Sequence, residues 1–166
     1  MTINRGTEDR EKTTVGSDCL LMAYSHVAHD CIIGDRVILA NSANLGGHVV
    51  IEDWAIIGGM VGIHQFVHIG RHSLIGGGFR TGKDIPPYVI AGGEPISYKG
   101  LNTIGLKRRG FTKESIDRIK KAYRIIYNSK HITSDALKIL KEDSDISKEV
   151  SNIIDFFENS DRAIIR

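Results

Sequence analysis

Two histidines and an aspartate lie close enough together in the sequence to form a general base. The segment HVAHD contains His26, His29 and Asp30, and His48 follows in LGGH. An imidazole with an ordinary pKa near 6.5 can accept a proton from a hydroxyl at neutral pH. A neighbouring carboxylate can orient that ring and stabilise its cation. A single surface histidine is uninformative, but this combination favours acid–base chemistry.

The chain around these residues repeats every six positions. Neither a coiled coil, with its period of seven, nor an amphipathic helix has this spacing. A small or β-branched residue comes four places after nearly every repeated aliphatic residue, and the residue directly after the aliphatic one is often glycine. The repeated aliphatic residues are Val15, Leu21, Val27, Ile33, Leu39, Leu45, Ile51, Ile57, Ile63, Ile69 and Ile75.

This hexad predicts a left-handed parallel β-helix over residues 15–86, in which three hexapeptide repeats close one coil of 18 residues. The inward aliphatic side chains then stack about 4.8 Å above their equivalents one coil away. We expect glycine at the tight corners, where the backbone angles disfavour a side chain. The same coil length aligns Gly47 and Gln65 with His29, and His48 with Asp30. A glycine amide beside a base can stabilise an oxyanion.

The rest of the chain divides into three parts. Residues 1–14 are expected to form an N-terminal strand and a charged loop, and 87–111 a connecting segment after two prolines end the repeat. Residues 112–166 predict a helical domain, with Thr112 and Ser134 as N-caps of its first two helices. The fold class is therefore mainly β with an α-helical appendage. The apolar stripes of these helices are Ile116, Ile119, Tyr123, Ile126 and Tyr127, then Leu137 and Leu140, then Val150, Ile153, Ile154 and Phe157.

Composition narrows the possible partners. With 41% hydrophobic residues, 25% charged residues and a net charge of +2, the chain gives no indication of nucleic-acid binding. It has neither an apolar run of membrane-spanning length nor a signal peptide, so we expect a cytoplasmic protein with no integral membrane association. Cys19 and Cys31 are expected to be small core residues. The pair Arg108-Arg109 suits bidentate phosphate binding, which suggests a phosphorylated ligand or an acidic partner.

Zinc binding is the alternative interpretation of the histidine cluster. Histidines that hold a metal across stacked coils must be separated by one or two whole coils, and no two of the seven have that spacing. We therefore expect no metal. A non-catalytic trimeric scaffold, or a fragment of a longer protein, is the second hypothesis beside an enzyme, and a zinc lyase is the third.

Several longer motifs resemble one known family. These are HVAHDCIIGDRVILANSANLGGHV, GGMVGIHQF, DIPPYVIAGG, GLKRRGF and DFFENSDRAIIR. Over residues 2–166 the chain resembles the C-terminal part of the UDP-N-acetylglucosamine acyltransferases of lipid A biosynthesis. The resemblance implies transfer of an (R)-3-hydroxyacyl group from acyl carrier protein to the 3-hydroxyl of UDP-N-acetylglucosamine. It also implies a homotrimer with active sites between subunits, and no cofactor.

The resemblance further implies roles for individual residues. His29 is the general base, Asp30 supports it, and the Gly47 amide stabilises the tetrahedral oxyanion. Gly47 and Gly77 correspond to positions that determine the length of the acyl chain. The residues implied to contact the sugar nucleotide are His26, His48, His64, Gln65, Asn102, Arg108 and Arg109.

Overall fold

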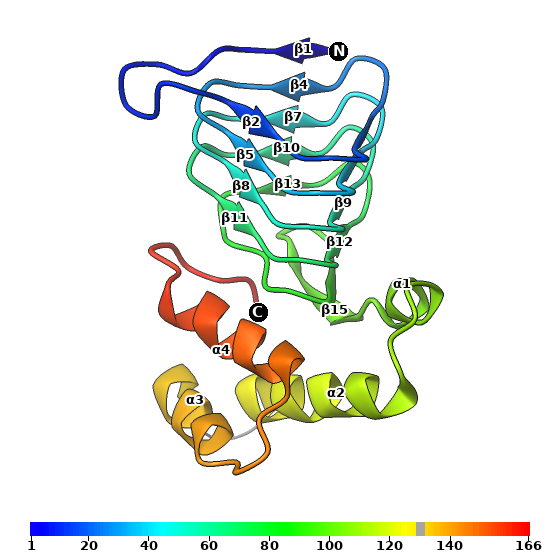
Figure 1. Cartoon of the computed structure of the whole chain (residues 1–166), viewed down its shortest axis with the longest axis vertical. Coiled ribbons are helices and arrows are strands. Elements are labelled where there is room, and N and C mark those ends of the chain that lie inside the picture. Colours follow the sequence, from blue (N-terminus) through cyan, green and yellow to red (C-terminus); the bar gives the residue numbers. More distant parts are fainter. Residues whose placement is uncertain (129–131) are drawn as a thin grey trace.

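The computed structural model describes residues 1–128 and 132–166, so His131 lies outside the described residues. The chain forms a parallel β-solenoid followed by helices at one end (Figure 1). The helices are α1 (Thr103–Arg108), α2 (Lys113–Asn128), α3 (Thr133–Lys141) and α4 (Lys148–Glu158). The strands are β1 (Thr2–Ile3), β2 (Thr14–Val15), β3 (Leu20–Leu21), β4 (His26–Val27), β5 (Ile32–Ile33), β6 (Ile38–Leu39), β7 (Asn44–Leu45), β8 (Val50–Ile51), β9 (Ile56–Ile57), β10 (Gly62–Ile63), β11 (His68–Ile69), β12 (Leu74–Ile75), β13 (Arg80–Thr81), β14 (Val89–Gly92) and β15 (Ser97–Leu101).

Each regular strand of the solenoid pairs with the strand three places further along the chain. Sheet A has the order β1-β4-β7-β10-β13, sheet B β2-β5-β8-β11, and sheet C β3-β6-β9-β12-β14-β15. His26 pairs with Asn44 and Thr14 pairs with Ile32, both in parallel register. Both pairings span the predicted coil length, which is therefore confirmed. The left-handed sense of the coil stays a prediction.

The two ends of the solenoid depart from the regular step. Thr2 of β1 pairs with His26 of β4, which is further along the chain than one regular coil because residues 4–13 leave the coil as a loop. At the other end Leu74 of β12 pairs with Ile90 of β14, a step slightly shorter than one regular coil. The loop at 4–13 projects beside the corner that carries His29, so it contributes to the site described below.

The core follows the hexad. The repeated aliphatic residues from Val27 to Ile75 are at most 4% exposed, and Cys31, Val37 and their equivalents line the same interior. The first coil is more open, since Val15 is 37% exposed. Burial of each such side chain contributes roughly 1.5–3 kcal/mol, so the stacked columns are the main source of solenoid stability.

The glycines have a different function from the one expected. The corner residues with positive φ lie three places after each aliphatic, and most are not glycines: Asp30, His48 and Trp54 have φ of 60°, 60° and 63°, whereas Gly78 is a glycine in this position with φ of 79°. The glycine directly after the aliphatic is needed for close approach instead. A Cβ on Gly46 would lie 2.6 Å from the backbone nitrogen of Gln65 in the next coil. The expectation of glycine at strained corners therefore holds at Gly78 and is wrong at corners such as those of Asp30, His48 and Trp54.

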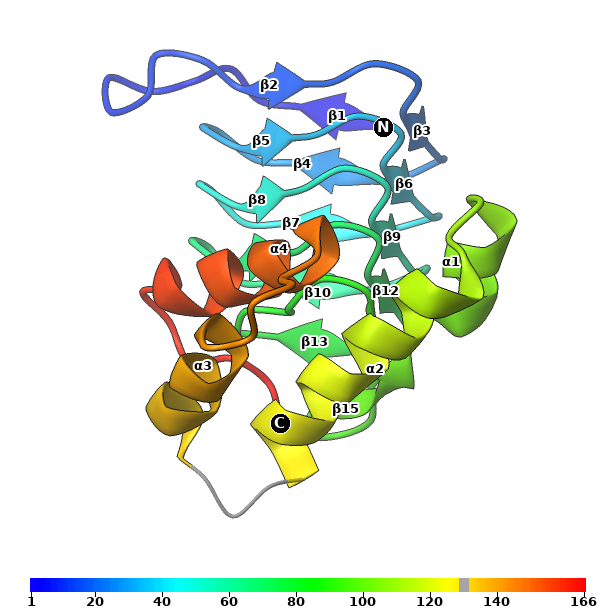
Figure 2. The ribbon, with the colours of Figure 1, turned by 60° about the horizontal axis from the view of Figure 1, so that its bottom comes forward.

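The helices cover the far end of the solenoid and part of sheet B. Figures 1 and 2 both show α2 and α3 at the end opposite β1, with α4 beside the lower strands. The His68 and Phe156 rings lie 4.6 Å apart, which joins sheet B to α4. The buried Tyr123 hydroxyl donates to the Pro87 carbonyl at 2.6 Å. The predicted apolar stripes are packing faces, since Ile116, Ile119 and Ile153 are at most 6% exposed.

The helix ends agree with the sequence in part. Thr112 Oγ1 accepts a hydrogen bond from the Ser115 amide at 3.1 Å, so the predicted cap of α2 is confirmed. The predicted cap at Ser134 is wrong, because α3 begins one residue earlier and has no side-chain cap. Helix α1 was expected to be part of a connecting segment. It begins after Asn102, whose Oδ1 accepts from the Gly105 amide at 3.2 Å.

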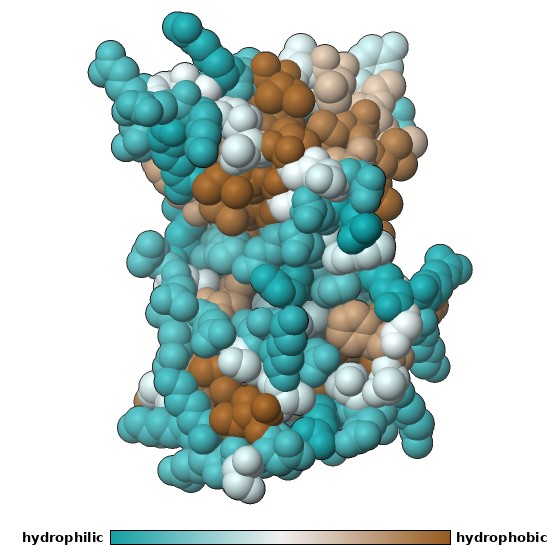
Figure 3. Space-filling model, in the orientation of Figure 1, coloured by the Kyte–Doolittle hydropathy of each residue, from teal (hydrophilic) through white to brown (hydrophobic). Residues whose placement is uncertain are grey.

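Much of the outer surface of the first coils is apolar. Figure 3 shows this as brown atoms over the upper part of the solenoid. The exposed aliphatic side chains there include Val15, Leu20 and Ile32, of which Leu20 is 52% exposed. In the part of the chain that the structure describes, no helix has the length and apolar character needed to cross a bilayer.

Candidate active site

The candidate base lies at the corner where the chain passes from sheet A to sheet B. His29 and Asp30 follow β4, and Gly47 and His48 follow β7 one coil later. The His48 amide donates to the His29 carbonyl at 3.0 Å, so the two corners are stacked directly. The alignment expected from the coil length is therefore present.

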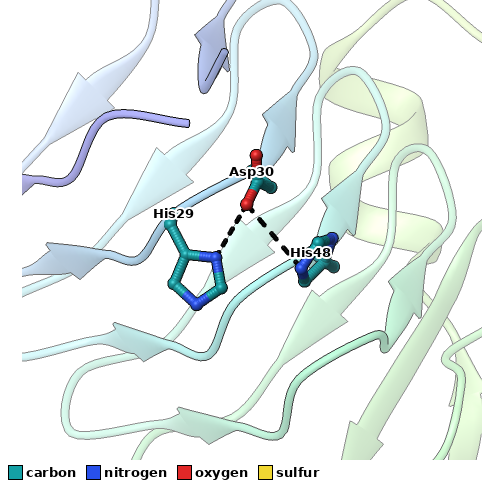
Figure 4. A group of neighbouring side chains, drawn as sticks. All are labelled: His29, Asp30 and His48. Atoms are coloured by element: carbon teal, nitrogen blue, oxygen red, sulfur yellow. Dashed lines mark hydrogen bonds and ion pairs between the residues drawn. The ribbon is translucent and has the colours of Figure 1, made fainter. Parts of the chain in front are cut away.

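Asp30 connects the two imidazole rings (Figure 4). His29 Nδ1 lies 2.8 Å from Asp30 Oδ2, and His48 Nε2 lies 3.7 Å from the same oxygen. The Asp30 side chain is fully buried, whereas the His29 side chain is 41% exposed. Because an ionised carboxylate only accepts hydrogen bonds, His29 must carry a proton on Nδ1. This tautomer leaves Nε2 as the basic nitrogen, on the accessible edge of the ring.

The surroundings of Asp30 keep it ionised. Burial alone would raise the pKa of the carboxyl, but hydrogen bonds from Thr7 and His29 and the charge of His48 hold that pKa well below its usual range. The Thr7 hydroxyl donates to Oδ2 at 2.6 Å and the Thr7 amide donates to Oδ1 at 2.9 Å. Asp30 is therefore a fixed anion throughout the neutral pH range.

Gly47 leaves room for the His29 ring. A Cβ at this position would lie 2.6 Å from Cε1 and 2.7 Å from Nε2 of His29, closer than real contacts allow. In the described part of the chain, the Gly47 amide donates no hydrogen bond. A free amide on the residue that adjoins the basic ring can stabilise an oxyanion formed by base-assisted attack.

An open cleft of about 860 Å³ lies in front of His29. Its other walls come from the start of the chain and the loop at 4–13. Substrate atoms in this cleft can reach the exposed edge of the imidazole. The residues that line it are Ile3, Asn4, Arg5, Gly6, Thr7, Glu8, Glu11 and His29.

Sequence reasoning missed several neighbours of the pair. Phe66 stacks on His48 with ring centroids 4.6 Å apart, and Asp9 Oδ2 lies 3.5 Å from His48 Nδ1. Phe66 comes one coil after His48, so the coil length could have revealed it. Thr7 and Asp9 belong to a loop outside the repeat, and no sequence signal indicates where they lie.

Asn102 and Arg109 occupy a different corner, where the chain passes from sheet B to sheet C. The Arg109 guanidinium lies 5.2 Å from the centroid of the Trp54 ring, and its Nη1 lies 3.3 Å from His72 Nδ1. Asn102 Nδ2 donates to the His72 carbonyl at 3.0 Å. Arg108 is exposed at the end of α1.

The His72 ring is held neutral at this corner. Burial, then the charges of Arg109 and Arg71, lower the pKa of His72 to about 4. The neutral ring can therefore accept a hydrogen bond from Arg109 through Nδ1. Its Trp54 and Tyr88 neighbours stack on either side, with ring centroids 6.0 Å and 5.7 Å away.

The remaining candidate residues are dispersed. His26 lies in sheet A and His64 directly follows one of its strands, and His26 Nδ1 lies 2.7 Å from Thr2 Oγ1. Gln65 is exposed one coil beyond Gly47. Gly77 lies at the third corner, between sheets C and A, where a Cβ would be 3.1 Å from the Gly59 carbonyl oxygen. One chain thus brings His29, Asp30, Gly47 and His48 together. His64 and Gln65 lie further along the same corner, whereas Asn102, Arg108, Arg109 and Gly77 lie at other corners.

The histidine cluster also has the composition of a metal centre. His29, Asp30 and His48 each offer a ligand atom, and these three atoms lie within 4.8 Å of one another. The Asp30 carboxylate, however, already accepts two hydrogen bonds from Thr7 and one from His29. Hydrogen bonding thus accounts for the arrangement without an ion, and the absence of a metal stays a prediction.

The chain matches two family models. Residues 84–165 match the model described as UDP-N-acetylglucosamine O-acyltransferase, domain 2. Residues 12–47 match the bacterial transferase hexapeptide model of six repeats. The first match covers the end of the solenoid and the helices, and the second covers the coils that carry the His29 corner.

Curated relatives extend this similarity over the whole chain. The acyl-[acyl-carrier-protein]–UDP-N-acetylglucosamine O-acyltransferase of Burkholderia mallei is 46% identical over 99% of this chain. The Pseudomonas aeruginosa protein of the same name is 41% identical over all of it. This chain spans 65% of the length of each of these relatives.

Solved structures give the same result. A UDP-N-acetylglucosamine acyltransferase from Bacteroides fragilis is 49% identical, with a TM-score of 0.93 over 97% of this chain and 63% of its own. The Francisella novicida enzyme is 38% identical, with a TM-score of 0.94 over 99% of this chain and 60% of its own. The hexapeptide solenoid, its helical end and this similarity together show that the chain belongs to the UDP-N-acetylglucosamine O-acyltransferase family.

Proposed function

We propose that this chain carries the catalytic corner of an acyltransferase that moves an (R)-3-hydroxyacyl group from acyl carrier protein to the 3-hydroxyl of UDP-N-acetylglucosamine. This is the reaction that the relatives' names describe in outline, and it would be the first step of lipid A biosynthesis. One observation carries the proposal: Asp30 holds His29 by Nδ1, and His29 Nε2 occupies the space that a Cβ on Gly47 would fill.

The reaction needs only groups at this corner. His29 Nε2 removes the proton of the sugar hydroxyl while its oxygen attacks the thioester carbonyl carbon. The carbonyl electron pair moves to oxygen, and the Gly47 amide donates a hydrogen bond to that oxyanion. When the tetrahedral intermediate collapses, the carbon–sulfur bond breaks and the departing thiolate takes the proton from His29. Asp30 stabilises the imidazolium between these two steps.

We propose that the sugar nucleotide contacts the remaining candidate residues. His48 adjoins the base, and His26, His64 and Gln65 lie along sheet A and its corner. All four suit the polar sugar. Asn102, Arg108 and Arg109 suit the diphosphate and the nucleoside, because guanidinium groups bind phosphate oxygens in pairs. Gly77 would limit the acyl chain. No cofactor is required beyond the acyl carrier protein donor.

A homotrimer would unite these residues, since the group around His29, the group around Arg109 and Gly77 lie at three different corners of the solenoid. The exposed apolar side chains of the first coils support association, because contiguous apolar surface is a feature of subunit interfaces. Three solenoids packed around an axis can place the His29 corner of one subunit beside a different corner of its neighbour.

The test is replacement of His29 by Ala in the same chain. Removing a general base lowers turnover by about 10²- to 10⁴-fold, while a half-exposed side chain contributes little to stability. His68→Gln is the matched control: its ring bonds to Glu52 on sheet B, away from the cleft, and turnover should persist. Retained transfer in the His29 variant contradicts the proposal. Calorimetry that detects no binding of UDP-N-acetylglucosamine favours a non-catalytic scaffold.

A further inference from the structure

We infer that Thr7 is a positioning residue for the reaction proposed above, because its hydroxyl and amide fix the Asp30 carboxylate so that Oδ2 points at His29. This inference rests on the proposed function for its catalytic meaning. The part that says Thr7 orients the Asp30 carboxylate concerns this chain alone and can be tested without measuring turnover.

The loop at 4–13 contacts every polar part of Asp30. The Thr7 hydroxyl and amide donate to the two carboxylate oxygens at 2.6 Å and 2.9 Å. Thr13 Oγ1 accepts from the Asp30 amide at 2.9 Å, and Arg10 Nη1 donates to the Asp30 carbonyl at 3.1 Å. The residue that orients the candidate base is therefore itself held by a segment outside the repeat.

Asp30 needs this support because two imidazoles compete for it. His29 Nδ1 is 2.8 Å from Oδ2, and His48 Nε2 is 3.7 Å from the same atom. The residue also has φ of 60°, a region that non-glycine residues adopt at a cost unless the surroundings hold them there. With both oxygens bonded to Thr7, the carboxylate cannot rotate towards His48 without losing a hydrogen bond.

The charged groups around Asp30 are few. His29 and His48 face the carboxylate, Arg10 bonds to its backbone carbonyl, and Asp9 lies on the far side of His48. The neighbouring Cys31 thiol is buried, which raises its pKa and keeps it neutral. Thr7 is the uncharged donor in this set, so replacing it changes hydrogen bonding without changing any charge.

The test compares Thr7→Val with Thr7→Ser and Thr14→Val. Loss of a hydrogen bond to a charged group should lower kcat about tenfold, with KM nearly unchanged, because the Thr7 hydroxyl and amide both bond to Asp30 and act through it. The pH at which Asp30 takes up a proton should rise, since a weaker hydrogen-bond network stabilises its anion less. Thr7→Ser keeps the hydroxyl and should restore both values. Thr14, on the next strand, has no side-chain bond to Asp30 and should behave as wild type.

Nuclear magnetic resonance provides the readout that needs no activity. In Thr7→Val, the carboxyl carbon of Asp30 should titrate at higher pH than in wild type, and the His29 ring nitrogens should lose the single tautomer with a proton on Nδ1. An unchanged Asp30 titration and an unchanged His29 tautomer in this variant overturn the inference, as does a Thr7→Ser variant that behaves like valine. If these signals shift as expected in Thr7→Val but the wild-type protein shows no turnover, the inference stands and the proposed function fails.

Discussion

Two corners of the solenoid share a backbone geometry but place their histidines in opposite electrostatic surroundings. At the first corner, the anion of Asp30 lies between His29 and His48. At the second, His72 is stacked between Trp54 and Tyr88 and faces the cations Arg109 and Arg71. Asp30 and His72 have φ of 60° and 56°, so the corner itself does not decide what chemistry results.

The two corners differ in whether their histidine can exchange a proton with a molecule from solvent. The first has a 41% exposed imidazole, an ionised partner and an open cleft, which are the requirements for proton transfer. The second has a ring that is neutral above about pH 4 and accepts a hydrogen bond from a guanidinium. The first corner suits catalysis, and the second suits holding Arg109 in place.

The strongest way to break this contrast is to remove the anion with Asp30→Asn. The side-chain amide then presents a donor where Thr7 or His29 also donates, and the tautomer of His29 is no longer fixed. By analogy with other base-orienting carboxylates, kcat should fall about 10³- to 10⁴-fold. The matched control is Asp18→Asn at the second corner, where a 67% exposed carboxylate pairs with Arg36. Steady-state kinetics checks both, and equal losses would remove the distinction.

A smaller loss is expected from Gly47→Ala. Its Cβ would meet the His29 ring at 2.6 Å, so the imidazole must move away from the neighbouring amide. A displacement of about 1 Å in a reacting group can cost roughly 10²-fold in rate. In Gly82→Ala, the nearest atom to the new Cβ is 3.9 Å away, so activity should be retained. Wild-type kcat in Gly47→Ala would show that the ring does not need this space.

Gly77→Met tests whether the third corner limits the acyl chain. The same test at Gly47 would also displace His29, so Gly77 separates chain length from catalysis. A methionine should shift donor preference to shorter chains, by about fourfold for each methylene that no longer fits. Competition between acyl carrier protein donors of different length measures this shift. An unchanged donor profile with unchanged kcat would contradict a length-limiting role.

The smallest effect concerns stability against pH. His72 is neutral in the folded chain down to about pH 4, whereas it takes up a proton near pH 6.5 when unfolded. The unfolded state therefore binds more protons between these values, and the free energy of unfolding should fall as the pH decreases from 6.5 to 4. Allowing for solvent screening, this loss is on the order of 1 kcal/mol. His72→Asn is the variant to use, because asparagine tolerates positive φ. Urea unfolding of this variant should show a free energy of unfolding that changes less between pH 6.5 and 4.

Asp30 affects the free energy of unfolding in a separate, more acidic pH range, which serves as the internal control. Its lowered pKa stabilises the folded chain above the ordinary carboxyl value near 3.9, and that stability is lost only at more acidic pH. His72→Asn should leave this acid limb in place. A variant that keeps the slope between pH 6.5 and 4 would assign that slope to another group.

Periodicity made the solenoid predictable because every inward residue has the same environment. Ile33, Ile51 and Ile69 stack in one column, and the coil length they imply also placed His29 beside Gly47. The corners were not predictable in the same way. The positive-φ position holds residues as different as Asp30, Trp54 and Met60, so composition gives no indication of the strain there.

The rest of the site depends on segments with no period. Thr7 lies in an insertion whose path is determined by its contacts with Asp30, and those contacts exist only after the coil has formed. Arg109 reaches His72 because α1, a six-residue helix with Gly105 inside it, turns the chain back towards the solenoid. Both features follow from tertiary contacts and not from local propensity, so the sequence alone could not indicate them.

The stacked rings at the second corner have an optical consequence. Trp54 is the sole tryptophan of the chain, and the guanidinium groups of Arg36 and Arg109 lie 5.0 Å and 5.2 Å from its ring centroid. Indole emission responds to nearby charge, so any anion that draws Arg109 away alters the intrinsic fluorescence of the protein. The fold thus contains its own label for anion binding at this edge, and that label does not report on the distant imidazole of His29.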